Sequence, residues 1–248
     1  MEAWDTYVSR MATHGVTKRD ASLIRERRHL NNKLPDSLSY HPIIIDGADR
    51  KMAVIDSDDF DIKHLRSMPG EDIRFGAYAE YFNQKWIVIE KDYSNELYTK
   101  AKMRQCNYLL KWVAEDETIQ ERWCIIDDGT KALTGEYSDR QYIVTRGDSR
   151  LALTIPKDNY TSKLDRNVRF IIDADDTDDH MAFRLTKPIR VGATFGDDGI
   201  YAFELTECNT EDGDNFELRI ANYYDHFPKP NADNTTITTD THGKTGWL

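Results

Sequence analysis

The sequence predicts a mainly β protein with two tandem related small β-barrels, an N-terminal helical pair and an extended C-terminal tail. From His41 onward, short β-branched and aromatic runs alternate with Gly, Asp and Asn at roughly even spacing, which is typical of a barrel or sandwich. Apolar residues at helical spacing occur only before residue 34. Two stretches of the β region also begin alike: His-Pro-Ile-Ile-Ile-Asp-Gly from residue 41 and Arg-Trp-Cys-Ile-Ile-Asp-Asp-Gly from residue 122.

The first segment, residues 1–35, is expected to hold two short helices within residues 2–33. The first helix face consists of Trp4, Tyr7, Val8 and Met11. Gly15 follows at the position of a left-handed C-terminal cap. Thr17 begins the second helix, with Asp20 completing an imperfect capping box, and Pro35 ends it.

The β region is expected to contain many short strands. One hairpin is predicted between Tyr81 and Trp86, where polar turn residues separate two apolar runs. The expected strands are Ile43–Ile45, Ala53–Ile55, Ile73–Phe75, Ala77–Phe82, Trp86–Glu90, Arg104–Trp112, Trp123–Ile126, Tyr142–Val144, Leu151–Ile155, Val168–Ile172, Met181–Leu185 and Ile200–Thr206.

Internal similarity divides this region into a first barrel, 41–113, and a second barrel-like block, 122–208. Asp72-Ile73-Arg74-Phe75 in the first block matches Asn167-Val168-Arg169-Phe170 in the second, and the longer middle spacing of the second block indicates an insertion of 14 residues. Chance similarity between two β sequences is the alternative. Residues 216–248 are expected to form a C-terminal strand and a flexible tail rich in Asn, Thr, Asp and Gly.

Composition excludes several classes of protein. No apolar run approaches the roughly 18 residues that a membrane helix needs, and the first residues lack the pattern of a signal peptide. Three widely spaced cysteines, Cys106, Cys124 and Cys208, are expected to be buried thiols of a protein made in a reducing cytoplasm. A net charge of −11 argues against a main task of gripping nucleic acid phosphates.

The charge is distributed unevenly along the chain. Residues 10–33 carry seven cationic and two acidic side chains, a balance of +5, so the remainder carries −16. The cationic helices could be ordinary solvated faces, could dock on an acidic protein partner, or could contact DNA. The candidate docking residues are Arg10, Lys18, Arg19, Arg25, Arg27 and Arg28.

The sequence predicts no catalytic residue, no metal site and no cofactor. Its seven histidines include no H-E-x-x-H pair, and no nucleophile motif is present. The acidic run Asp173–Asp179 lacks the glycine and glutamate of a calcium loop, so it is interpreted as a solvated hairpin loop, as are Asp56–Asp61 and Glu211–Asp214. A pair of carboxylates acting as in a glycosidase stays an alternative.

Several aromatic residues cluster in the first block and could form a stacking or sugar-binding platform. On the strands of a small barrel such residues more often form the core and cross-strand pairs. They are Tyr78, Tyr81, Phe82, Trp86, Tyr93 and Tyr98.

Several runs along the sequence resemble those of a known protein family. The helical segment, Ile43–Gly47, the run Gly76–Val88 and above all Gln105–Trp112 are similar to structural proteins encoded in the head-to-tail gene block of tailed phages and prophages of Gram-positive bacteria. The Gly-x-x-x-x-Tyr, turn, Trp-Ile-Val pattern resembles the small β-barrel of head-closure (stopper) proteins. Those proteins have one barrel, whereas this chain predicts two, so a stopper, an adjacent connector ring and a tail-side component all remain open.

The resemblance implies a virion protein without chemistry of its own that retains packaged DNA between the head and the tail. It would form a ring of about six or twelve copies, bind a portal or adaptor ring and tail or tail-terminator proteins, contact double-stranded DNA transiently and avoid membranes. The terminal segment would meet the tail through Phe227 and Trp247. Acidic lumen or plug loops would consist of Asp56, Asp58, Asp59, Asp61, Asp173, Asp175, Asp176, Asp178 and Asp179.

A host-surface or carbohydrate-binding virion protein is the alternative function, and a carboxylate-dependent hydrolase is a third. The first predicts exposed aromatic residues beside the acidic loops. The second predicts a concave pocket with converging carboxylates.

Overall fold

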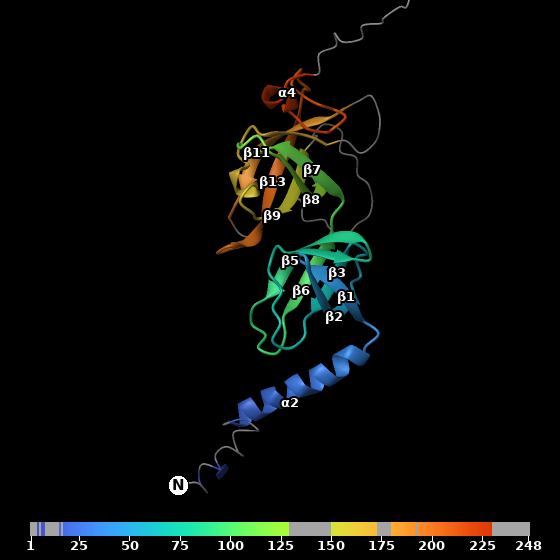
Figure 1. The fold of residues 1–248 in the computed structure, drawn as a ribbon, viewed down its shortest axis with the longest axis vertical. Helices are drawn as coiled ribbons and strands as arrows, with labels where there is room; N and C mark the ends of the chain where they lie inside the picture. The colour runs from blue at the N-terminus through green and yellow to red at the C-terminus, as the bar shows by residue number, and fades with distance from the viewer. Residues whose placement is uncertain are drawn as a thin grey trace, which may run out of the picture.

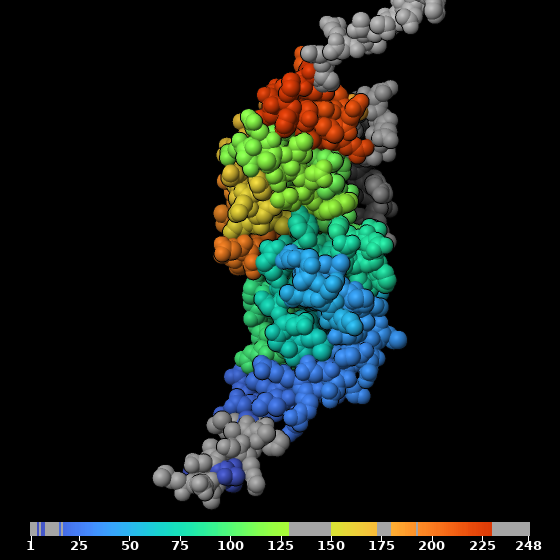
Figure 2. All heavy atoms as spheres, viewed as in Figure 1, coloured from blue at the N-terminus to red at the C-terminus, as the bar shows by residue number. Residues whose placement is uncertain are grey.

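The computed structural model describes residues 4, 6, 7, 15, 17–128, 150–172, 180–191 and 193–229. These residues form an elongated stack of four parts. Helix α2 lies at one end, a first barrel follows, then a second sheet, and a C-terminal segment that contains α4 lies at the far end (Figure 1). The space-filling view shows the same order along the body, from the blue helix to the red C-terminal segment (Figure 2).

Helix α2 (Lys18–Lys33) confirms the second predicted helix, and the 3-10 helix η1 (Leu34–Asp36) ends it. The predicted capping box is present: the Thr17 hydroxyl accepts from the Asp20 N–H, and the Asp20 carboxylate accepts from the Thr17 N–H. No residue of α2 is buried, so its capping and charges have to support it locally. Of the first predicted helix, the structure describes only Trp4, Thr6 and Tyr7, which are helical.

The first barrel is a closed sheet of six antiparallel strands in the order β1-β2-β3-β6-β5-β4. Inward-facing Met52, Val88 and Met103 are fully buried in its core. The predicted hairpin joins β4 to β5 through Phe82 and Asn83, which both have positive φ. The strands are β1 (Tyr40–Ile45), β2 (Ala48–Asp56), β3 (Ile62–Arg66), β4 (Tyr78–Tyr81), β5 (Gln84–Asp92) and β6 (Lys100–Gln105).

The second sheet has seven strands, of which six follow the order β10-β11-β13-β9-β8-β7 while β12 pairs with β13. The Tyr108 hydroxyl donates to the Ile171 carbonyl at 3.1 Å, which brings the two outer strands β7 and β10 together. The strands are β7 (Tyr108–Val113), β8 (Ile119–Asp128), β9 (Arg150–Pro156), β10 (Arg169–Ile171), β11 (Ala182–Ile189), β12 (Thr194–Phe195) and β13 (Asp198–Cys208), with the 3-10 helix η2 (Thr161–Lys163) between β9 and β10.

The two sheets repeat one topology. Setting β12 aside and counting from the first strand of each sheet, both follow the order 1-2-3-6-5-4. The fifth strand is also bulged at the same place in both, between Val88 and Glu90 in β5 and between Leu185 and Lys187 in β11. The predicted pair of related barrels therefore exists as two barrel-like sheets of one design.

The hydrogen bonds give the register of this repeat. Val88 exchanges hydrogen bonds with Gly76 and Ala77, and Leu185 exchanges the corresponding pair with Asn167 and Val168. Gly76 and Asn167 both have positive φ. Gly76 therefore corresponds to Asn167, and the predicted match of Asp72 with Asn167 was wrong by four residues. The opening match was also wrong, because residues 41–47 lie in β1 and the following turn, whereas residues 122–128 lie in β8, the counterpart of β2.

Three boundaries also differ from the prediction. The expected strand Arg104–Trp112 is two strands in different sheets, so the first barrel ends at Gln105 rather than at 113, and the second sheet begins at Tyr108. Residues Ile73–Phe75 are not a strand, although Ile73 and Phe75 are buried. Within the described residues after β13, no strand forms, and the chain turns into α4 (Tyr223–His226). The expected strand Tyr142–Val144 lies outside the described residues.

Candidate assembly interface

The two barrels are joined by a clasp around Arg104, on the outer side of β6. Its guanidinium donates two hydrogen bonds of 2.7 Å to Asp127 of β8 and one of 2.8 Å to Asp61 of the first barrel. The three side chains are only 22–28% exposed. The hydrogen bonds to Asp127, aided by the one to Asp61, raise the pKa of Arg104 against the effect of burial, so the clasp keeps its cation.

A small apolar core lies beside the clasp. Ile87 of the first barrel, Cys106 directly after β6 and Ile125 of the second sheet are buried together. Tyr78 packs against them and donates its hydroxyl to the Trp123 carbonyl at 2.7 Å. Burial raises the pKa of the Tyr78 phenol and raises that of the Cys106 thiol to about 12, so both groups stay neutral. The predicted burial of Cys106 and Cys124 is confirmed, while Cys208 is half-buried.

Backbone contact closes the joint on its other side. Gly199 donates its N–H to the Phe75 carbonyl at 3.3 Å. A Cβ added to Gly76 would stand 2.1 Å from the Gly199 carbonyl oxygen, and Gly76 has φ +77°. Only glycine fits here, because both the conformation and the close approach exclude a side chain.

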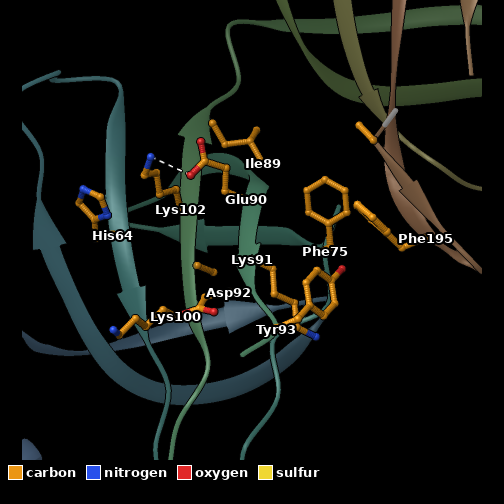
Figure 3. Close-up of a pocket in the computed structure, with 12 residues that line it drawn as sticks. His64, Phe75, Ile89, Glu90, Lys91, Asp92, Tyr93, Lys100, Lys102 and Phe195 are labelled. Carbon is orange, nitrogen blue, oxygen red and sulfur yellow. Dashed lines mark ion pairs between the residues drawn. The ribbon is translucent and has the colours of Figure 1, made fainter. Parts of the chain in front are cut away.

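A groove of about 560 Å³ opens where the β5–β6 end of the first barrel meets β12. Figure 3 shows the rings of Phe75, Tyr93 and Phe195 gathered together, with His64, Lys100 and Lys102 across the hollow. The Phe195 ring centroid lies 5.6 Å from those of both Phe75 and Tyr93. Tyr93 and Phe195 are 58% and 55% exposed. Of the predicted aromatic set, Tyr81 and Trp86 are core residues, whereas Tyr93 faces this groove.

The cations of α2 divide into two groups. Arg19 pairs with the Glu96 carboxylate at 2.5 Å, and Arg27 donates to the Glu96 carbonyl at 3.2 Å. These two candidate docking residues therefore hold the helix to the β5–β6 connection of its own barrel. Lys18, Arg25 and Arg28 are exposed and form no salt bridge within the part of the chain that the structure describes. Arg10 lies outside the described residues.

The acidic loop Asp56–Asp61 is only partly a free acidic surface. Asp56 pairs with Lys63 at 2.6 Å and Asp61 belongs to the Arg104 clasp. A hydrogen bond and the charge of Lys63 hold the pKa of Asp56 below its usual value. Asp58 and Asp59 are exposed. The other predicted acidic loop, with Asp173, Asp175, Asp176, Asp178 and Asp179, lies outside the described residues.

The C-terminal segment contains an ion pair that sequence reasoning missed. Arg169 of β10 binds both carboxylate oxygens of Asp214 at 2.9 Å, and the side chains are 5% and 0% exposed. Arg169 also donates to the Asn222 side chain at 2.8 Å and to the Asn209 carbonyl at 2.7 Å. The interpretation of Glu211–Asp214 as a solvated loop is therefore wrong for Asp214, because the sequence does not reveal a partner 45 residues away.

The predicted tail residues have a mixed outcome. Phe227 stacks on Tyr223 of α4, with ring centroids 4.7 Å apart, so it belongs to the folded C-terminal segment. Trp247 lies outside the described residues.

Among the described residues, no group of three or more His, Cys, Asp or Glu side chains is placed to hold a metal ion. The described helices include none that is long and apolar enough to span a membrane.

One comparison with known families gives a match, which lies within α2 and the first barrel. Residues 22–105 match the family model of the YomX N-terminal domain. This domain family is associated with phage genes. The match begins inside α2 and ends with β6, so it coincides with the first barrel and most of its helix and covers about a third of the chain. The comparisons with curated proteins and with solved structures give no match.

Proposed function

We propose that this chain is a structural virion protein that forms a ring at the phage head–tail interface, as a head-closure protein or an adjacent connector. In this role it retains packaged DNA and joins the portal or adaptor ring to the tail. The proposal includes no catalytic step and no cofactor.

One observation carries the proposal: two barrels of one topology form a continuous stack, and among the described residues a cationic helix lies at one end of it. The joint between the barrels combines a half-buried ionic clasp, an apolar core and a glycine contact. Contacts of three kinds thus join the barrels end to end, an arrangement that suits a connector between two rings. The phage-associated family of residues 22–105 supports the same context.

The charge distribution supports the proposed partners. Lys18, Arg25 and Arg28 leave a cationic face on α2, which suits an acidic surface on the portal or adaptor ring. The rest of the chain carries the negative charge, so a channel lined by it would repel DNA phosphates and let DNA pass without binding. Asp58 and Asp59 are the described acidic residues best suited to that lining, because neither forms a salt bridge within the described residues.

The test is localisation and head retention. Immunogold labelling of virions is expected to place the protein at the neck, and phage lacking it is expected to give filled heads that lose DNA and have no attached tail. A triple variant, Lys18→Glu, Arg25→Glu and Arg28→Glu, should abolish incorporation, while the matched set of exposed residues Lys51→Glu, Arg66→Glu and Arg166→Glu on the barrels should not. Absence from virions, or labelling only at the distal tail tip, would overturn the proposal.

A second function is favoured by the groove at the barrel joint. Exposed Tyr93 and Phe195 beside Asp92 and Glu90 offer the ring faces and carboxylates that bind sugars. A carbohydrate-binding virion protein would show a sugar-dependent thermal shift that Tyr93→Ala and Phe195→Ala remove. Absence of any shift across host cell-wall glycans would rule out this reading.

A further inference from the structure

The repeat register shows which faces of the two barrels correspond. Because Gly76 corresponds to Asn167, Tyr78 of β4 corresponds to Arg169 of β10. Directly after β6, the backbone N–H of Cys106 donates to the Lys85 carbonyl, and at the end of β13, Cys208 is paired with Ala182. Lys85 and Ala182 each lie three residues before the matched Val88 and Leu185, so Cys106 corresponds to Cys208. The outer face that begins at Tyr78 and ends at Cys106 is therefore the counterpart of the face that begins at Arg169 and ends at Cys208.

On the first barrel, this face holds the second barrel. Tyr78 donates to the backbone of β8, Arg104 binds a carboxylate of β8, and Cys106 is buried against Ile125.

On the second barrel, the same face holds residues Asn209–Phe227, which we call the C-terminal cap. Arg169 binds the cap through Asp214, and Cys208 packs with Phe216 and Ala221. The chain enters the cap directly after Cys208, just as it enters the second barrel after Cys106.

The cap fits this face less completely than a barrel does. The Nε atoms of Arg169 and Arg184 are buried and have no hydrogen-bond partner among the described residues. Arg184 corresponds to Ile87, which is fully buried at the barrel joint. Two cationic side chains thus stand at positions where the first barrel has Tyr78 and Ile87. Arg169 binds the cap carboxylates of Asp214 and Glu211, whereas Arg184 forms no salt bridge within the described residues, so this face favours a partner that bears carboxylates.

We propose that the outer face of β10, β11 and β13 is a second barrel-docking face, which the C-terminal cap covers in the free chain and a partner barrel bearing carboxylates takes over on assembly. The partner class rests on the proposed function. The cap prevents premature end-to-end association, as terminal caps do in repeat proteins. Besides apolar contacts, the cap is held at Arg169 by the buried Asp214 pair, by Glu211 at 3.3 Å and by hydrogen bonds to Asn222 and Asn209. A partner that supplies carboxylates at this arginine would compete with the cap for the same donors.

The first test opens the cap. Asp214→Asn removes the charge partner of Arg169, and Asp212→Asn, an exposed carboxylate in the same loop, is the matched control. In Asp214→Asn, Cys208 is expected to react with a thiol reagent about 100-fold faster or more, because loss of a buried ion-pair partner favours local opening. Cys106 and Cys124 should stay protected, and amide exchange should rise only in the cap.

A reaction of Cys124 would mean that the barrel itself had opened. In that case the thiol-reactivity measurement is repeated on Asn222→Gly. This variant removes one hydrogen bond to Arg169 and keeps the backbone at φ +56°. Unchanged Cys208 reactivity in both variants would overturn the proposal.

The second test probes the uncovered face. A fluorescent peptide of residues 209–227 is expected to bind the Asp214→Asn protein but not the wild type, whose tethered cap competes at an effective concentration of about millimolar. The same peptide with Asp214→Asn should fail to bind. Equal binding of the two peptides, or no binding by either, would refute a carboxylate-specific docking face. Both tests are independent of location in the virion, so their failure would leave the connector proposal intact.

Discussion

Asp127→Asn is expected to loosen the joint between the barrels. The substitution removes the charge from the partner of two 2.7 Å hydrogen bonds donated by Arg104, at side chains that are 22% and 23% exposed. Hydrogen bonds to charged groups contribute roughly 1.5–3 kcal/mol. Partial exposure favours the lower end of that range, so we expect a loss of about 2 kcal/mol.

A loss of this size should lower Tm by about 4–8 °C for a chain of this length. Calorimetry should also show the single unfolding transition broadening or splitting, because the two barrels would no longer unfold together.

The matched control is Glu121→Gln, which breaks the surface pair with Lys111. The carboxylate of that pair is 49% exposed, so the expected loss is below about 1 kcal/mol. Arg104→Met combined with Asp127→Asn completes a double-mutant cycle and should show a coupling of about 1–2 kcal/mol. If Asp127→Asn cost no more than Glu121→Gln, the clasp would not hold the barrels together.

Three other changes test separate parts of the fold. Gly76→Ala should cost several times more in urea unfolding than Gly47→Ala, because both have positive φ but a Cβ meets backbone only at Gly76; equal costs would contradict the close approach. Burial opposes ionisation of Asp158, yet hydrogen bonds, including one from Arg122, hold its pKa below the usual value. This stabilisation is present above about pH 4 and lost as pH falls through the lowered pKa. Asp158→Asn lacks it, so the pH at which half of the protein is unfolded by acid should be higher in the variant than in the wild type. Thr17→Ala should reduce helical circular dichroism without changing the barrel Tm, because α2 has no buried residue; a large fall in Tm would contradict this.

The repeat illustrates where sequence reasoning reached its limit. Two related barrels were predicted correctly, because alternating apolar residues reveal strands wherever one face is buried. The register was wrong by four residues at Gly76 and by one strand at the start, because side-chain alternation repeats every two residues and many alignments satisfy it. The deciding observation, the paired hydrogen bonds of Val88 and Leu185, depends on strand pairing that no local pattern encodes.

The local features could be derived from the amino-acid sequence alone: the capping box of α2, the β4–β5 hairpin, the β-rich composition and the opposed charges of the helix and the body. These depend on neighbouring residues, so local physics is sufficient. Three features became evident only in the folded structure: residues 104–112 are divided between two barrels, Asp61 and Asp127 share Arg104, and Asp214 is buried against Arg169. A charged side chain becomes buried only when a distant partner compensates the loss of water, and that partner is known only once the chain has folded.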